Sequence, residues 1–247
     1  MDAPDYLATL NPQQYEAVTH KGSPLLILAG AGSGKTRVIT TRIAYLVDHL
    51  RIDPRSILAV TFTNKAAREM SERARSLSSE ADKVMIRTFH SFGAWMLRRN
   101  AQIAGLKPGF TIYDDDDALT LLHSLNDARR KQDLKRFNRM ISRAKDYALT
   151  PDDDLQQISA EPELPQLYRA YQKRLNQVGN VDFGDLILKP MQLLNESEEL
   201  RRRFHQRFRI VMVDEYQDTN VAQYRLLKSL AGPETEVCVV GDEDQSI

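Results

Sequence analysis

A glycine-rich segment near the start of the 247-residue chain carries the first candidate functional residues. The apolar run of residues 25–28 is followed by Ala29, Gly30, Ala31, Gly32, Ser33 and Gly34, and then by Lys35, Thr36 and Arg37. Glycines let backbone N–H groups converge on an anion without a Cβ in the way, and the start of a helix adds its positive dipole end. The pattern predicts a phosphate-binding loop between a buried strand and a helix.

Lys35 and Thr36 supply the side-chain chemistry of this loop. An ammonium group here can reach the β- and γ-phosphates of a nucleotide, and a hydroxyl group can bind the Mg²⁺ that bridges them. The usual pattern has a glycine where this chain has Ala29, and alanine is small enough to be accepted there. We therefore expect residues 29–36 to bind ATP together with Mg²⁺.

Two adjacent carboxylates, Asp214 and Glu215, follow the apolar residues 209–213. Beside a phosphate-binding loop, Asp214 would hold Mg²⁺ through its water shell, and Glu215 would orient or deprotonate the water that attacks the γ-phosphate. Gln245 comes after another apolar run, where its amide would sense the γ-phosphate. These roles predict hydrolysis rather than transfer of the phosphate to a second substrate.

The elements that must position these groups are short buried strands alternating with helices. Beyond the strand before the glycine-rich loop, we predict strands at residues 57–61, 84–88, 209–213 and 236–240. In an open parallel sheet, ligands bind at the carboxyl ends of the strands, so the loops that follow them meet at one edge. The predicted fold class is α/β with a parallel sheet.

Two of these strands end in aromatic and polar side chains. Phe62, Thr63, Asn64 and Lys65 follow one strand, and the next strand ends in Thr88 and is followed by Phe89 and His90. Aromatic faces stack on unpaired bases, so the first loop is expected to bind single-stranded nucleic acid. The alternative for the first loop is a buried Phe62 beside Thr63 as a helix N-cap. His90 is not expected to be catalytic.

From about residue 95 to about residue 177 the pattern changes to helices without buried strands between them. This predicts an inserted helical subdomain, in which the four aspartates of residues 114–117 cap a helix and Thr150 with Pro151 starts another. Residues 134–147 carry an apolar stripe opposite a basic one. The apolar stripe is expected in the core and the basic one in solvent, with a DNA-backbone contact as the alternative.

Composition limits the remaining possibilities. The chain has 34 Lys and Arg residues against 34 Asp and Glu residues, so any binding to nucleic acid must use local patches. No apolar span of about 20 residues occurs and residues 1–5 do not resemble a signal peptide, so we expect no membrane partner and a cytoplasmic location. Cys238 is the only cysteine, which excludes disulfides and zinc sites, and it is expected to be buried and unreactive.

Taken together, these segments resemble the superfamily 1 helicases of the UvrD/Rep/PcrA group. The matches, in family order, are residues 10–14 (the adenine-reading Q motif, with Gln14), 29–36 (motif I), 61–70 (motif Ia), 88–91 (the following DNA-contact motif), 213–220 (motif II) and 240–247 (the start of motif III). The resemblance implies a RecA-like P-loop domain 1A at residues 1–94 and 181–247, interrupted by the helical subdomain 1B at residues 95–180. It also implies that Arg37 packs on the adenine and that Gln245 couples the nucleotide state to DNA.

The implied activity is ATP-dependent DNA unwinding in repair or replication, with 3′ to 5′ translocation on single-stranded DNA and binding to single/double-strand junctions. The chain stops within motif III, so we expect an N-terminal part that lacks the second RecA-like domain with its arginine fingers and has little or no activity alone. The alternatives are the helicase part of an AddA/RecB-type nuclease and a nucleotide-dependent binding module without motor action. Gly184 departs from the family pattern, where a second acidic residue is usual. The sequence identifies no protein partner.

Overall fold

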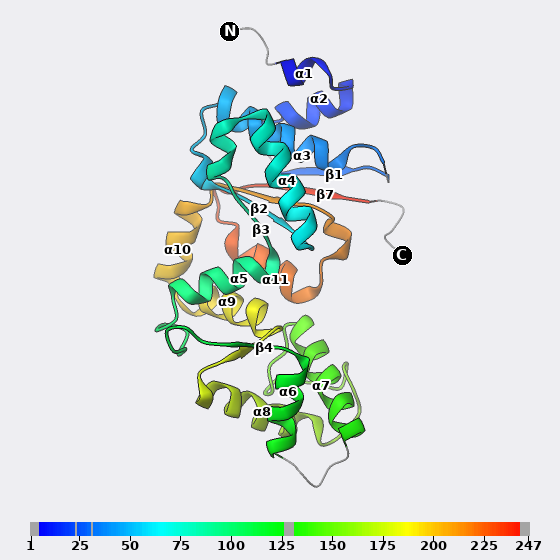
Figure 1. Cartoon of the computed structure of the whole chain (residues 1–247), viewed down its shortest axis with the longest axis vertical. Coiled ribbons are helices and arrows are strands. Elements are labelled where there is room, and N and C mark those ends of the chain that lie inside the picture. The colour runs from blue at the N-terminus through cyan, green and yellow to red at the C-terminus, as the bar shows by residue number, and fades with distance from the viewer. Residues whose placement is uncertain (1–4, 23, 31, 126–130, 243–247) are drawn as a thin grey trace. The chain divides into compact units, whose positions relative to one another are not determined.

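The computed structural model describes residues 5–22, 24–30, 32–125 and 131–242 (Figure 1). The chain divides into two compact units. The sheet unit comprises Met1–Phe89, Glu199–Thr219 and Leu230–Ile247, and the helical unit comprises His90–Glu198 and Asn220–Ser229. Residues 95–180, the predicted insertion, all lie in the helical unit, which extends beyond them at both ends.

The sheet unit is built on five parallel strands in the order β1-β7-β6-β2-β3. The strands are β1 (Leu25–Leu28), β2 (Ile57–Thr61), β3 (Met85–Thr88), β6 (Ile210–Val213) and β7 (Glu236–Gly241). The short apolar strands β2 and β6 are buried along their whole length, which is typical of central strands in parallel sheets. The first and last strands of the chain, blue β1 and red β7 in Figure 1, pair directly. The predicted α/β class with a parallel sheet is confirmed.

The sheet unit also contains helices. They are α1 (Asp5–Ala8), α2 (Pro12–Thr19), α3 (Lys35–Ala44), α4 (Asn64–Leu77) and α10 (Glu198–Arg207), with single turns η1 (Tyr45–His49), η2 (Pro54–Ser56), η3 (Ser79–Lys83) and η4 (Tyr216–Asp218). The main core combines side chains of α3, α4 and the strands, among them Ile39, Met70 and Met212. Cys238 belongs to this core, so its predicted burial is confirmed, and burial raises the pKa of its thiol to about 11.

The helical unit contains α5 (Phe89–Arg99), α6 (Asp115–Leu125), α7 (Lys131–Asp146), α8 (Leu164–Val178), α9 (Asp185–Glu196) and α11 (Val221–Leu230). The predicted apolar stripe of α7 is buried at Phe137 and Ile141. Helices α5 and α9 touch backbone to backbone, since a Cβ added at Gly93 would lie 1.7 Å from the carbonyl oxygen of Leu186. Within the described ranges, no helix is long and apolar enough to cross a membrane.

Two features of the helical unit differ from the prediction. The strands β4 (Ile112–Tyr113) and β5 (Val181–Asp182) form a two-residue parallel ladder among the helices. The predicted helix start at Thr150 and Pro151 is wrong, because residues 151–163 form turns and the next helix is α8. The carboxylate of Asp153 accepts hydrogen bonds from both the N–H and the hydroxyl of Thr150, at 2.7 Å each. These short-range bonds close a turn in place of a helix.

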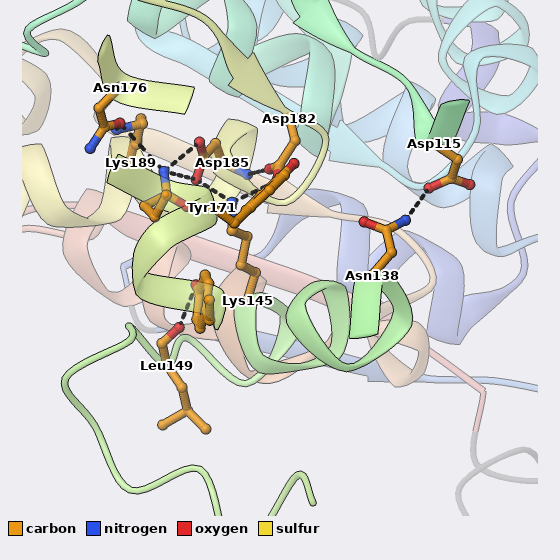
Figure 2. A network of polar contacts seen from close by, with 11 residues as sticks. Asp115, Asn138, Lys145, Leu149, Tyr171, Asn176, Asp182, Asp185 and Lys189 are labelled. Carbon is orange, nitrogen blue, oxygen red and sulfur yellow. Dashed lines mark hydrogen bonds and ion pairs between the residues drawn. The ribbon is translucent and has the colours of Figure 1, made fainter. Parts of the chain in front are cut away.

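A buried ion cluster ties α7 to the end of β5 and the start of α9 (Figure 2). Lys145 is fully buried, and its Nζ lies 2.6 Å from Asp182 Oδ2 and 2.8 Å from Asp185 Oδ1. Tyr171 donates its hydroxyl to the same oxygen of Asp182 at 2.9 Å. Burial alone would lower the pKa of Lys145, but the charges and hydrogen bonds of the two carboxylates outweigh it and raise that pKa. The lysine therefore stays charged in the interior.

We expect Lys145→Met to lower the free energy of unfolding by about 3 to 5 kcal/mol, because it leaves two buried carboxylates without their cation. Lys135→Met is the matched control, since Lys135 is an exposed lysine of the same helix and should change stability by less than about 0.5 kcal/mol. Urea denaturation of the two variants and the parent chain measures the difference. Equal losses in both variants would contradict a stabilising role for the buried cluster.

Candidate active site

Parallel pairing in the sheet unit brings the predicted chemical groups to one edge. Leu28 pairs with Gly241 and Val213 with Val239, so β1, β7 and β6 end side by side. The glycine-rich loop follows β1, Asp242 follows β7, and Asp214 follows β6. Three segments that are distant in the sequence therefore meet at the carboxyl edge, where open parallel sheets bind their ligands.

The glycine-rich loop has the backbone that its sequence predicts. Gly34 is the N-cap of α3 with φ 90°, and Gly32 has φ 77°, a left-handed conformation that glycine adopts without a Cβ penalty. The N–H of Val38 donates to the carbonyl of Gly34 at 3.0 Å and begins the helix, whose positive end faces the loop. Ala31 lies outside the described residues.

Lys35 is the first residue of α3 and is held at the base of the loop. Its Nζ donates to the carbonyl of Ala29 at 3.1 Å and lies 3.0 Å from Asp242 Oδ2. The side chains of Lys35 and Asp242 are 9% and 2% exposed, so each neutralises the charge of the other at a site with little solvent. Asp242 was not predicted as a site residue. The feature that could have indicated it is its position directly after β7, the strand that pairs with β1.

The carboxylates of Asp214 and Glu215 lie in contrasting environments. Asp214 is 3% exposed. Its burial and the charge of Glu215 raise its pKa to about 6, and the nearby charge of Lys35 offsets part of that rise. Glu215 is half-buried and has φ 52°, a strained conformation for a residue with a side chain. Its N–H donates to Asp214 Oδ1 at 3.1 Å, so the two residues form one compact acidic turn.

The acidic turn lies near enough to the glycine-rich loop for Lys35 to act on Asp214. Carboxylate and hydroxyl oxygens suit Mg²⁺, and Thr36 is the second residue of α3, one position after Lys35. In the described part of the chain, no group of three or more His, Cys, Asp or Glu side chains could hold a metal ion. A cation here would therefore need further oxygens from phosphate groups or water, as Mg²⁺ sites in nucleotide-binding proteins usually do.

Gln14 and Arg37, the two residues predicted to contact the adenine, connect the segment before β1 with the glycine-rich loop and the start of α3. Gln14 forms a capping box with Asn11 at the start of α2, and its Nε2 also donates to the carbonyl of Ser33 at 3.1 Å. Arg37 donates to the carbonyl and the hydroxyl of Thr9, at 3.1 and 2.6 Å. Both side chains thus lie beside the glycine-rich loop. Gln245 lies outside the described residues.

The loop after β2 combines both interpretations offered for it. Thr63 caps α4 by accepting the N–H of Ala66 at 3.0 Å. Phe62 is half-buried and packs on Phe89, with ring centroids 5.3 Å apart. Asn64 and Lys65 are exposed, whereas Thr88 and Phe89 are buried. Phe62 and the polar residues after it therefore present a surface, and Phe89 supports Phe62 from inside.

His90 lies in the helical unit at a cavity that the sequence analysis did not predict. Its ring centroid is 4.4 Å from that of Phe183, and burial lowers the pKa of the imidazole, which favours its neutral form at pH 7. Phe183 is 59% exposed, and both residues line a cavity of about 450 Å³ together with Asn138 and Asp146. The sequence signal that could have indicated this cavity was Phe183, an apolar residue directly after Asp182. The side chain of Asp182 binds Lys145 in the interior.

The family model described as UvrD/REP helicase N-terminal domain matches residues 10–247. The chain belongs to this helicase family. The ATP-dependent DNA helicase Rep of Escherichia coli (strain K12) is 43% identical over 245 residues, which cover 96% of this chain and 36% of Rep. The ATP-dependent DNA helicase PcrA of Bacillus subtilis (strain 168) is 43% identical over 249 residues, covering 98% of this chain and 34% of PcrA.

A third UvrD/REP relative, the ATP-dependent DNA helicase UvrD1 of Mycobacterium tuberculosis (strain H37Rv), is 43% identical over 264 residues, covering 99% of this chain and 34% of UvrD1. The chain spans about a third of the length of these curated relatives. The membership identified from the sequence motifs is confirmed.

In this UvrD/REP chain, Asp214→Asn should make the fold more stable at neutral pH. A carboxyl whose pKa rises on folding, here from 3.8 to about 6, binds a proton more readily in the folded state. The free energy of unfolding therefore falls as pH rises through that window, by at most about 3 kcal/mol for this group. We expect the variant to exceed the parent by about 1 to 3 kcal/mol at pH 7.5 and by little at pH 4.5, in urea titrations with EDTA.

The matched control is Asp218→Asn, which changes an exposed aspartate four residues further on. Its stability difference from the parent should stay within about 0.5 kcal/mol at both pH values, as is usual for surface substitutions. A pH-independent effect of Asp214→Asn would contradict the burial argument.

Proposed function

We propose that this chain is the N-terminal, ATP-binding part of an ATP-dependent DNA helicase that moves 3′ to 5′ along single-stranded DNA in repair or replication. The observation that carries the proposal is the meeting of Lys35, Asp214 and Glu215 at the carboxyl edge of the sheet, beside a glycine-rich loop capped by Gly34. The three relatives described above carry the name ATP-dependent DNA helicase, which supports the same conclusion.

In the proposed site, each predicted residue has one task. The backbone N–H groups of residues 29–34 bind the phosphates, and Lys35 leaves Asp242 to neutralise the β- and γ-phosphates. Thr36 and Asp214 hold Mg²⁺, which supplies charge neutralisation when bound. Glu215 orients or deprotonates the attacking water. The adenine lies against Gln14 and Arg37, and Gln245 senses the γ-phosphate.

The proposed domains follow the family pattern, with domain 1A at residues 1–94 and 181–247 and subdomain 1B at residues 95–180. Single-stranded DNA binds along the loops that follow β2 and β3. In these loops Phe62 stacks on a base, residues 63–65 contact phosphates, and Thr88, Phe89 and His90 support the path. A second RecA-like domain of the same polypeptide completes the ATP site with arginine fingers, and the enzyme acts at single/double-strand junctions.

Two substitutions separate nucleotide binding from turnover. Lys35→Ala should abolish binding of a fluorescent ATP analogue and lower stability as well, because it removes the cation that faces the buried carboxylate of Asp242. Glu215→Gln should keep the affinity for the analogue within about two-fold and lower the DNA-stimulated ATPase rate of the full-length enzyme by at least about 100-fold. Normal turnover in Glu215→Gln would show that another group acts on the water. Tight nucleotide binding by Lys35→Ala would contradict the site.

Phe62→Ala should weaken single-stranded DNA binding of the full-length enzyme by about 1 to 3 kcal/mol, the range for loss of one stacking platform. Tyr15→Ala is the matched control, since Tyr15 is an exposed aromatic residue of α2 in the same unit. Fluorescence anisotropy with a labelled oligothymidylate measures the affinity, and thermal melting measures the fold. Unchanged DNA affinity with a lower melting temperature would leave Phe62 as a core residue only.

A further inference from the structure

Gln217, in the turn η4, links the acidic turn to the end of β7. Its side-chain Nε2 donates to Glu215 Oε2 at 2.6 Å. Its Oε1 accepts the backbone N–H of Asp242 at 3.0 Å. A Cβ added at Gly241 would lie 3.4 Å from the same Oε1, so the end of β7 passes close to this amide.

The chemistry of its two partners determines which way the amide points. A backbone N–H can only donate, and an ionised carboxylate can only accept. Only an amide presents an acceptor on one side and a donor on the other, at the reach of a glutamine side chain. A glutamate at this position would face Glu215 with a second carboxylate, and a methionine would satisfy neither partner.

The bond from Gln217 acts on a residue whose backbone is already constrained. Glu215 has φ 52° and follows Asp214 directly at the end of β6. Its carboxylate is half-buried, and one of its two oxygens is held by Gln217. The direction of the other oxygen therefore depends on where Gln217 holds the group.

The bridge also joins the acidic turn to the lysine of the loop. Lys35 pairs with the side chain of Asp242, whose backbone N–H donates to Gln217, which in turn donates to Glu215. These hydrogen bonds connect the ends of β1, β7 and β6, three neighbouring strands of the sheet. The position of the Asp242 backbone is thereby linked to the carboxylate of Glu215.

We propose that Gln217 is a positioning residue for ATP hydrolysis, which holds the carboxylate of Glu215 toward the attacking water and makes its position depend on the backbone of Asp242. This inference rests on the function proposed above. It assigns Gln217 no contact with nucleotide or metal. Its loss should therefore slow turnover without weakening nucleotide binding.

The test is a double-mutant cycle on the ATPase rate of the full-length enzyme with saturating single-stranded DNA. We expect Gln217→Ala to lower kcat about 10- to 100-fold, because small misplacements of a catalytic group have effects of this size. The affinity for a fluorescent ATP analogue should stay within about two-fold. In a Glu215→Gln background, Gln217→Ala should lower kcat no further, since the residue through which it acts is already lost.

Two further variants keep the outcome clear. Gln217→Met preserves the side-chain length and should behave like Gln217→Ala, so it replaces that variant if the alanine form does not fold. Gln206→Ala, an exposed glutamine of α10 at the amino end of β6, should leave kcat unchanged.

The outcomes separate this inference from the proposed function. A kcat within two-fold of the parent in Gln217→Met, or the same relative loss in the Glu215→Gln background, overturns the positioning role while ATP hydrolysis stands. A parent enzyme without ATP turnover overturns both.

Discussion

The parallel alignment of β1, β7 and β6 is the constraint on which the rest of the site depends. Parallel strands end at the same edge, and their register here places Leu28 beside Gly241 and Val213 beside Val239. The glycine-rich loop, the acidic turn after β6 and Asp242 after β7 are thereby held within hydrogen-bond reach of one another. The buried apolar runs that form the strands therefore bring a lysine and two carboxylates to one edge of the sheet.

Lys145 and Lys35 both pair with buried carboxylates, but their surroundings differ. Lys145 is fully buried between two carboxylates, which satisfy it and tie α7 to the β5–α9 segment. Lys35 is slightly exposed and bonds to one carboxylate and one carbonyl at the edge of the sheet. An ammonium has three donors, so Lys35 retains capacity to bind an incoming anion. The strain at Glu215 and the raised pKa of Asp214 occur at the same edge, and features of both kinds cluster at functional sites in proteins generally.

Much of the fold was predictable, because its signals are local. Apolar runs of three to five residues marked all five strands of the main sheet, and Asn11 with Pro12 marked the start of α2. Local signals also failed where the same residue types favour both a helix start and a turn. Thr150 and Pro151 suit a helix start, yet Asp153 satisfies the groups of Thr150 in a turn. The ladder of β4 and β5 was missed because two-residue strands leave no periodic pattern.

The sequence by itself determined the identity of the chemical groups and the strand ends on which they lie. Glycine spacing, Lys35, Thr36, Asp214 and Glu215 can be read in order along the chain, since each follows its own apolar run. Only the tertiary structure decided which partner each group has. Lys35 and Asp242 are 207 positions apart, and Phe62 and Phe89 look alike in the sequence although only Phe89 is buried. Such pairings depend on which strands lie side by side in the sheet, and the spacing of residues along the chain does not determine that arrangement.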